Sequence, residues 1–460
     1  TPTQRSAPAR PTILVLPFVN MSGDSEQEYF TDGVSEDIIT DLGKVSALGV
    51  VSRSTAFTYK GKTVAPAQIA RELGVSHILE GSVRRSGQRV RITAQLLDAA
   101  TDAQLWADRF DRTLDDIFAI QDEISKAIVA ALKLKLAPEE KRALEQRATS
   151  NSEAYELFLM AREFSRTGSE RMKPLIVRLC RRAVELDANF AQAWAQIAFA
   201  EAEMAQRNVK GASFERALEA AKQAVAADPN FAEGHAALAE VMGRGAGLEL
   251  AAGEPHLKRA LALDPDCYEA HLFAGYVYIG RGQAQDAIRH FEAACALDPN
   301  AYRPAGMVVQ AYDALGDREA AAAAARRSLA RCEKLLAVEP DHSGALGFLV
   351  SALADLKELD RTRKWARLAV LFDPDNLRTH YNVACGLAKL GDAEAACDLL
   401  EKVVPAVSAG WALWIQKDNS LDSIRTHPRF VAIMHKALAR AAQSDAPTPP
   451  KKPRRRKEPT

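Results

Sequence analysis

The feature that most constrains this fold is an acidic residue followed by proline, which recurs through the middle and C-terminal parts of the chain. The steps are Asp228-Pro229, Asp264-Pro265, Asp298-Pro299, Glu339-Pro340 and Asp373-Pro374. Their prolines lie 36, 34, 41 and 34 residues apart. Because proline lacks a backbone N–H and disfavours helix at the preceding residue, each step predicts the end of a helix. The spacing predicts a repeated helical hairpin, with a lengthened helix or turn where it is 41 residues.

The clearest repeat unit spans Tyr268 to Pro299 and reads YEAHLFAGYVYIGRGQAQDAIRHFEAACALDP. Small residues at Gly275 and Ala287 allow its two predicted helices to approach closely, and Phe291 fills the space towards the next unit. At these positions the unit resembles the tetratricopeptide (TPR) repeat family. The resemblance implies an α-solenoid, an all-α superhelix in which each hairpin buries its apolar face against its neighbours.

About seven such units are predicted over residues 152–405, followed by capping helices over 406–440. The first helix of each unit is expected to line a concave groove that holds a partner. Five candidate partner-binding residues follow from this interpretation: Phe199, Glu240, Tyr276, Gln310 and Tyr381. The Lys and Asn pattern of chaperone-binding arrays is absent from the first helices. The sequence therefore predicts a protein or peptide partner, other than a chaperone tail, without identifying it.

Residues 13–141 follow a different pattern, in which short apolar runs alternate with helical segments. Strands are predicted over 12–20, 50–53, 77–83, 89–98 and 104–111, and helices over 29–42, 66–73 and 117–134. In the strand from Arg89, the apolar residues Val90, Ile92, Ala94 and Leu96 alternate with polar ones, which is typical of a strand with one buried face. The predicted fold class is thus an α+β domain with a mixed sheet and helices, followed by the all-α TPR superhelix.

Several motifs of this N-terminal segment resemble the TolB N-terminal-like (FlgO-like) domain. They are ILVLPFVNMSGD, EYFTDGVSEDIITDL, ILEGSVRRSGQRVRITAQLLDAATDAQLWADRFDR and DIFAIQDEI. In bacterial proteins this domain commonly precedes TPR repeats, downstream of class III adenylate cyclase or winged-helix DNA-binding domains. Acid-sensing CadC-type regulators are similar in layout. The resemblance implies a sensory or scaffold role for this part of the chain and does not identify a ligand.

Two charged groups in the N-terminal segment are candidate sites. The predicted helix over 29–42 carries four carboxylates, at Asp32, Glu36, Asp37 and Asp41. A metal site is one interpretation, and a solvated helix face with acidic residues near the helix start is the simpler one. The predicted hairpin carries four arginines that either bind an anion or acidic partner or keep an exposed strand soluble: Arg84, Arg85, Arg89 and Arg91.

Common catalytic motifs are absent from the sequence. It contains no GxxxxGK[ST] phosphate loop, GxSxG nucleophile turn or HExxH zinc helix. We therefore predict no catalytic, cofactor-binding or metal-binding residues, and a chain that is not an enzyme by itself. The six cysteines form no CxxC motif and predict buried thiols in a reducing compartment, the cytoplasm. No run of about 18 apolar residues predicts a membrane span.

The two ends differ from the rest in composition. The last ten residues hold six of the 60 basic side chains and one of the 60 acidic ones, although the formal net charge is zero. This basic run, at 451–457, belongs to a predicted disordered tail over 441–460, which either contacts nucleic acid or acidic lipid or only aids solubility. The remainder shows no nucleic-acid surface. Residues 1–12 are typical of an interdomain linker, and the chain opens on Thr1, so a piece of a longer protein is expected.

Three functional interpretations remain open at this point. In the first, the chain is a non-catalytic regulatory or scaffold region of a bacterial signalling protein, which binds a protein or peptide in the TPR groove and controls an attached output domain. In the second, it senses a metabolite bound between the α/β domain and the first repeats. In the third, it is part of an adenylate cyclase whose catalytic domain lies upstream of Thr1. A homodimer is compatible with each.

Overall fold

The structure is a computed structural model that describes residues 10–62, 64–145, 147–166, 170–206, 209–245, 252–407 and 409–444. These residues form two compact units. The first unit contains the described residues up to 242, together with 252–276 and 289–301. The second unit contains 243–245, 277–288 and the described residues from 302 onward. The predicted basic run at 451–457 and most of the predicted linker at 1–12 lie outside the described residues.

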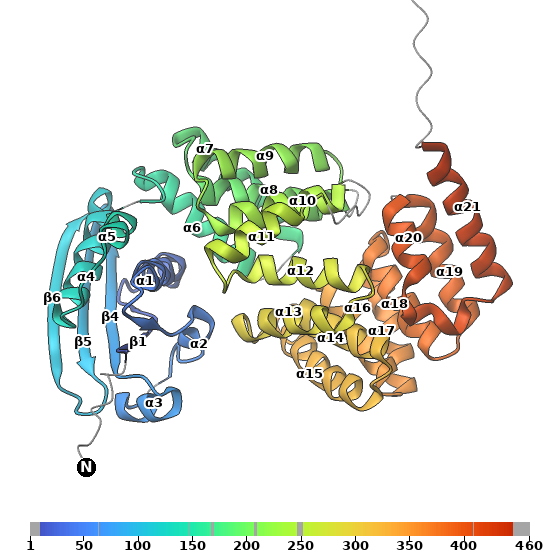
Figure 1. The fold of residues 1–460 in the computed structure, drawn as a ribbon, viewed down its shortest axis with the longest axis horizontal. Helices are drawn as coiled ribbons and strands as arrows, with labels where there is room; N and C mark the ends of the chain where they lie inside the picture. The colour runs from blue at the N-terminus through green and yellow to red at the C-terminus, as the bar shows by residue number, and fades with distance from the viewer. Residues whose placement is uncertain are drawn as a thin grey trace, which may run out of the picture. The chain divides into compact units, whose positions relative to one another are not determined.

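The first unit begins with a mixed six-stranded sheet, drawn in blue to cyan in Figure 1. Its strands are β1 (Thr12–Val15), β2 (Val19–Asn20), β3 (Gly49–Val50), β4 (His77–Ser86), β5 (Arg89–Asp98) and β6 (Gln104–Thr113). Their order is β3-β1-β4-β5-β6, with β2 also paired to β4. The pairs made by β1, β2 and β3 are parallel, whereas β4, β5 and β6 form an antiparallel meander. The strand predicted over 12–20 is divided because Pro17, which has no N–H to donate, lies in its middle.

Two helices cover this sheet on the side where its apolar side chains point. Helix α1 (Glu28–Gly43) packs on β1, β2 and β3, and α4 (Ile117–Ala131) packs on β5, β6 and α1. The alternation predicted for β5 is confirmed, because its four apolar residues from Val90 to Leu96 are all buried. The shorter helices of this part are α2 (Arg53–Phe57), α3 (Pro66–Leu73) and α5 (Pro138–Glu145).

From residue 152 onward the described chain is helical, as predicted. Its successive helix pairs are α6 (Ser152–Arg166) and α7 (Lys173–Leu186), α8 (Ala191–Gln206) and α9 (Phe214–Ala227), α10 (Ala232–Gly245) and α11 (Glu254–Leu263), α12 (Tyr268–Gly280) and α13 (Ala284–Leu297), α14 (Tyr302–Leu315) and α15 (Arg318–Leu336), α16 (Ser343–Asp355) and α17 (Leu359–Phe372), and α18 (Leu377–Lys389) and α19 (Ala393–Val403). Then follow α20 (Ala409–Lys417), the 3-10 helix η5 (Asn419–Ile424) and α21 (Pro428–Ser444). The predicted fold class, an α+β domain followed by an all-α TPR-type array, is confirmed. None of the described helices is both long and apolar enough to cross a membrane.

The aspartate-proline steps end helices, as predicted. Helices α9, α11, α13 and α17 each end directly before the aspartate of a step. In the steps at Asp228, Asp264 and Asp298 the carboxylate also accepts the backbone N–H two residues later, at 2.9 Å. The aspartate therefore stabilises the turn that the proline starts. The spacing of 41 residues arises from a lengthened helix, because α15 has 19 residues and α13 has 14.

Gly275 allows close packing of α12 against α13. Gly275, on α12, lies against the ring of Phe291, on α13, and a Cβ at position 275 would overlap that ring. Tyr276 meets the same ring edge-on, with 5.5 Å between the ring centroids. Phe291 is fully buried. The missing side chain at Gly275 therefore makes the space in which this aromatic ring packs.

We expect Gly275→Ala to lower the free energy of unfolding by about 1–3 kcal/mol, because the added methyl group overpacks the contact with Phe291. Gly43→Ala is the matched control, since a Cβ at this helical position meets no described atom within 4 Å. Denaturant unfolding of both variants measures the difference. If the two variants had the same free energy of unfolding, the ring of Phe291 would be able to accommodate the added methyl group, and the prediction would be wrong.

Candidate functional site

Acidic side chains of α1 lie where this helix contacts α6, the first helix of the repeat region. Asp32 and Glu36 are only 2% and 6% exposed. Their spacing of four residues places both on one face of α1, and that face is turned towards α6. The interpretation of this helix as a solvated acidic face is therefore wrong for these two residues, because another helix covers them. We call the contact between α1 and α6 the charged seam.

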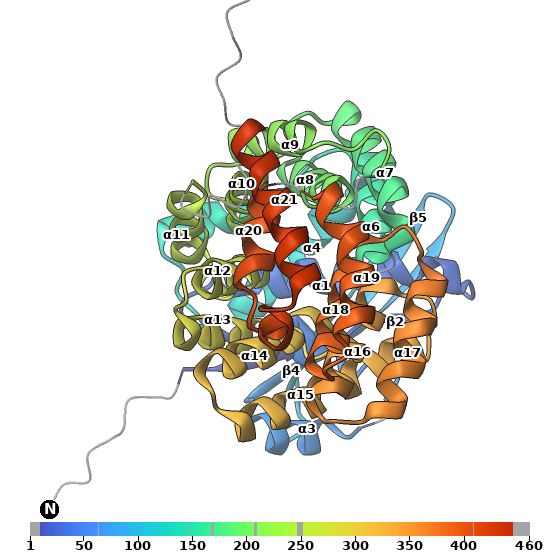
Figure 2. The ribbon, with the colours of Figure 1, turned by 90° about the vertical axis from the view of Figure 1, so that its right-hand side faces the viewer.

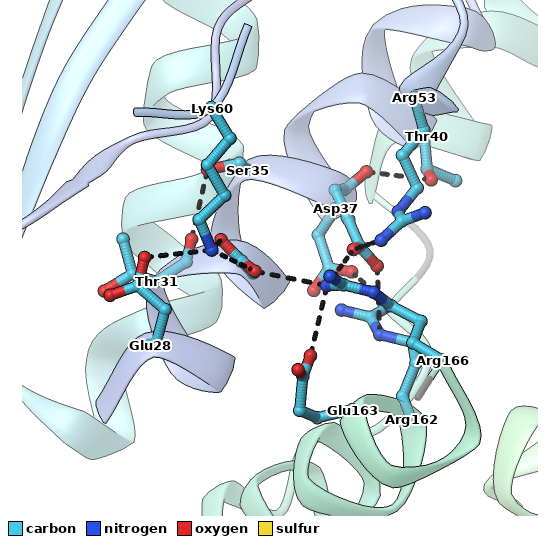
Figure 3. Close-up of polar contacts among 12 residues, drawn as sticks. Glu28, Thr31, Ser35, Asp37, Thr40, Arg53, Lys60, Arg162, Glu163 and Arg166 are labelled. Carbon is cyan, nitrogen blue, oxygen red and sulfur yellow. Dashed lines mark hydrogen bonds and ion pairs between the residues drawn. The ribbon is translucent and has the colours of Figure 1, made fainter. Parts of the chain in front are cut away.

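Glu36 binds three arginines from two helices. Its carboxylate lies 2.5 Å from Nη2 of Arg53 on α2, 3.1 Å from Nε of Arg162 and 3.6 Å from Nη1 of Arg166, the latter two on α6. Figure 3 shows these arginines converging from both sides of the seam. Burial raises the pKa of Glu36, but attraction to Arg162 and Arg53 outweighs burial and holds this pKa below its ordinary value. The carboxylate therefore stays charged.

Asp32 lies one helical turn before Glu36, and cationic side chains bind its carboxylate as well. Nζ of Lys60 donates to both carboxylate oxygens of Asp32, at 2.7 and 2.6 Å, and Nη1 of Arg166 lies 3.1 Å away. Lys60 also pairs with Glu28 at 2.9 Å, as Figure 3 shows. Within the described residues, no group of three or more His, Cys, Asp or Glu side chains is arranged to hold a metal ion. The seam carboxylates are instead bound by side-chain cations.

Asp37 extends the seam to a third helix. It accepts hydrogen bonds from the hydroxyl of Tyr155 on α6, and from Nε2 of Gln121 on α4 at 3.1 Å. Nη1 of Arg162 lies 3.4 Å from its other oxygen. The amide of Gln121 also donates to the hydroxyl of Tyr155, at 3.0 Å. These contacts join α1, α4 and α6 at one point.

A second ion pair attaches the sheet to α6. Arg85, one of the predicted anion-binding arginines, donates to both carboxylate oxygens of Glu156, at 2.7 and 3.1 Å. The hydroxyl of Tyr29 donates to the same carboxylate at 2.8 Å. The guanidinium of Arg85 also lies 5.3 Å from the ring centroid of Phe30. The acidic group that Arg85 binds in this structure thus belongs to the repeat region of the same chain.

The other three arginines of the hairpin contact their own domain. Nε of Arg84 donates to the carbonyl of Met21 at 3.2 Å. Arg89 and Arg91 both pair with Asp111 on the neighbouring strand β6, at 3.1 and 2.5 Å. The anion or partner role predicted for these arginines stays a prediction.

The seam residues of α6 were absent from the sequence interpretation. Arg162 and Arg166 are four residues apart, and so are Asp32 and Glu36. Matching i,i+4 spacings of opposite charge on two predicted helices are the signal that would have suggested the pairing. The signal is weak alone, because such spacings are frequent on solvated helices.

The five predicted groove residues lie on first helices of their units, three in the first compact unit and two in the second. Phe199 on α8 is half-buried, and Glu240 on α10 is 7% exposed. Tyr276 on α12 contacts Phe291. These three belong to the first unit.

Gln310 and Tyr381, in the second unit, bind a residue of their own chain. Nε2 of Gln310 donates to Asp418 at 2.9 Å, and the hydroxyl of Tyr381 donates to the other oxygen of the same carboxylate. Asp418 also caps η5, because it accepts the backbone N–H of Ser420 at 2.8 Å. Helices α14, α16 and α18 pack side by side (Figure 2), and η5 contacts α14 and α18. The chain therefore places its own segment against two predicted partner-binding residues.

Comparison with known proteins gives one family match and one curated relative. The Tetratricopeptide repeat family model matches residues 268–301, which confirms the predicted unit at Tyr268. The chain is 44% identical over 239 residues to a protein of Rhizobium meliloti (strain 1021) named "Putative adenylate cyclase 3". The matched region is 50% of this chain and 40% of that protein. The chain thus spans well under half the length of this relative.

Solved structures resemble parts of the chain at low sequence identity. A thermophilic TPR protein of Thermus thermophilus is 21% identical, with a TM-score of 0.34, and the match covers 42% of this chain and 98% of that one. The Pseudomonas aeruginosa protein pilF is 18% identical, with a TM-score of 0.32, and the match covers 49% of this chain and 96% of that one.

We expect Glu36→Gln to lower the free energy of unfolding by about 3–5 kcal/mol, because it leaves Arg53 and Arg162 at the seam without their shared carboxylate charge. Glu163→Gln is the matched control, since Glu163 pairs with Arg166 at 3.1 Å from a position that is about one-third exposed. Its loss should cost about 0–1 kcal/mol. Denaturant unfolding at neutral pH compares the two. If Glu36→Gln lowered the free energy of unfolding no more than the control does, the charged seam would not stabilise the fold.

Asp41, at the end of α1, should make stability depend on pH. Burial raises its pKa to about 6, and Lys44, 2.8 Å away, offsets only part of the effect. A carboxyl with a raised folded-state pKa contributes stability below its unfolded pKa and loses it as pH rises through the folded pKa. Deprotonation of Asp41 alone should therefore lower the free energy of unfolding of the wild type by about 1 kcal/mol as the pH rises from about 5 to about 7.5.

Asp41→Asn removes this titration, so the variant should lose less stability than the wild type over the same interval. Denaturant unfolding at the two pH values measures the difference between the proteins. An unchanged pH dependence in the variant would exclude Asp41 as its source.

Proposed function

We propose that this chain is a non-catalytic regulatory and scaffold region of a bacterial signalling protein, which binds a protein or peptide partner and controls an attached output domain. The observation that carries the proposal is the 44% identity to a protein named "Putative adenylate cyclase 3", of which the matched region covers 40%. The TPR family match supports a protein-binding role for the helical part. Adenylate cyclase is accordingly the favoured output domain, with a winged-helix regulator as the other candidate, and the cytoplasm is the proposed location.

The charged seam supports a role in transmitting a signal. Buried ion pairs join α1 and α2 of the sheet domain to α6 of the first helix pair. Separating α6 from α1 would remove Arg162 and Arg166 from these buried carboxylates and leave them with fewer cations, which is costly. We therefore propose that the TolB-like domain and the first repeats move as one body. A partner that binds the repeats would then act on the sheet domain directly, and through it on the residues that precede it.

We place the partner on the groove residues of the first unit. Gln310 and Tyr381 are already bound by Asp418 within the chain. Phe199 is a half-buried aromatic residue on a first helix, and aromatic residues contribute strongly to protein interfaces. The proposed contact therefore centres on Phe199, with Glu240 and Tyr276 on the next first helices. We favour the metabolite-sensor interpretation less, since the described residues of α1 and α6 contact each other through their own side chains.

The test is capture of a partner by the purified full chain from a lysate of the source bacterium, with quantitative mass spectrometry of the retained proteins. Phe199→Ala should reduce retention of the partner at least about tenfold, because truncation of a central aromatic residue costs more than about 1.4 kcal/mol of binding. Phe372→Ala is the matched control, because Phe372 is an exposed phenylalanine at the end of a second helix. It should retain the partner as the wild type does.

Thermal unfolding establishes that both variants are folded. If no retained protein distinguishes Phe199→Ala from Phe372→Ala, the proposed groove is wrong. The purified partner is then added to the longer protein that carries the output domain. A change in cyclic AMP production that is lost with Phe199→Ala would support the link to a cyclase, and unchanged production would contradict it.

A further inference from the structure

Among the described residues, strand β6 forms one border of the six-stranded sheet and pairs with β5 on one side only. Figure 1 shows it at the outer margin of the sheet domain. The strand is ten residues long and contains no proline. Most of its side chains are exposed, including Leu105 at 45%. A strand of this length with one unpaired side can accept another strand.

The hydrogen-bond pattern shows which backbone groups of β6 point outward. The N–H of Leu114, just after β6, donates to the carbonyl of Gln88 at 2.8 Å, so residue 114 directs its backbone towards β5. In an antiparallel pair alternate residues do so, and the odd-numbered residues of β6 therefore point their N–H and C=O groups away from the sheet. The N–H of Arg109 confirms this direction, because it is bound by the carboxylate of Asp108 and not by β5.

The charges of β6 are arranged symmetrically about Phe110. Arg109 and Asp111 lie one residue before and after it, and Asp108 and Arg112 lie two residues before and after it. If two antiparallel copies of β6 were related by a twofold axis at Phe110, Arg109 of one copy would face Asp111 of the other. Asp108 would likewise face Arg112. Every one of these pairs would then join opposite charges. An axis at Asp108, Arg109 or Asp111 would instead place that charged residue opposite itself.

We propose that two copies of this chain pair through β6, as antiparallel strands with the twofold axis at Phe110, so that the two sheets become continuous. The odd-numbered residues exchange backbone hydrogen bonds in this register, and Arg109 gives up the contact of its N–H with the carboxylate of Asp108 for one across the interface. Asp108 of each copy faces Arg112 of the second copy, and Arg109 faces Asp111. Opposite charges on directly facing strand residues stabilise such a pair. A closed twofold contact of this kind leaves β6 of neither copy unpaired.

Charged side chains on an edge strand also serve to prevent pairing. A protective arrangement would oppose like charges in every central register, whereas β6 has one fully complementary register. Asp108 and Arg109 have no ion-pair partner in the described part of the chain, whereas Asp111 already pairs with Arg89 and Arg91 and would share its carboxylate with Arg109 of the second copy. Arg112 has only a distant contact, 3.5 Å from Glu123, between exposed side chains. The register shift between β5 and β6 lies at Leu96 and Leu97, towards the start of β6 and away from Phe110.

The test is sedimentation equilibrium of the full chain over concentrations from about 1 to about 200 μM, which spans the range expected of a modest interface. The wild type should approach the dimer mass as its concentration rises. Asp108→Arg and Arg112→Asp each place like charges opposite one another twice, and each should raise the dimer dissociation constant at least about tenfold. Arg71→Asp, an exposed charge reversal on α3, is the control and should leave the constant unchanged.

An equimolar mixture of Asp108→Arg and Arg112→Asp tests the register. In a mixed dimer every facing pair is again of opposite charge, so the mixture should recover the dissociation constant of the wild type. A wild type that stays monomeric, or single variants that dimerise as the wild type does, would overturn the proposal. Failure of the mixture to recover, with both variants folded by thermal unfolding, would overturn the register. The result does not depend on the proposed function, because it requires neither a partner nor an output domain.

Discussion

The buried ion pairs between α1 and α6 are the constraint on which the first unit depends. Glu36 and Asp32 have lost nearly all contact with water, and burial of a charge is tolerable only when cations and hydrogen-bond donors replace that water. Arg53 and Lys60 of the sheet domain provide part of the replacement, and Arg162 and Arg166 of the repeat region provide the rest. The same contact that neutralises α1 therefore sets where the first repeat helix lies on the sheet domain.

Apolar packing alone would specify this contact less well. Hydrophobic burial is non-directional, whereas the bidentate pair of Arg85 with Glu156 and the hydrogen bonds of Asp37 require particular atoms to meet. We infer that the seam selects one orientation of α6 on α1 among those that bury similar apolar area. A fixed orientation of α6 on α1 agrees with the proposal that a partner bound to the repeats acts on the sheet domain.

In the second unit, two predicted groove residues are bound by a side chain of the same chain. Asp418 is a buried residue whose carboxylate accepts hydrogen bonds from Gln310, Tyr381 and the N–H of Ser420, while Arg425 donates to its backbone carbonyl. Burial, followed by the charge of Asp418, raises the pKa of Tyr381 well above its ordinary value, so this hydroxyl keeps its proton and remains a donor. The predicted groove positions on α14 and α18 are thus chemically suited to holding a carboxylate, and the chain supplies one.

The sequence by itself determined the helical repeat, the ends of α9, α11, α13 and α17, and the two-part fold class. These depend on neighbours along the chain: a proline ends a helix locally, an aspartate caps its own turn, and the alternation of Val90 to Leu96 requires only a period of two. It did not reveal the burial of Asp32 and Glu36, whose partners on α6 lie more than a hundred residues away in the sequence. Nor did it reveal that Asp418 occupies Gln310 and Tyr381. Only the tertiary structure decided whether these charges and hydroxyls face water or one another, because that depends on which surfaces meet, and periodicity within one helix carries no information about the helix packed against it.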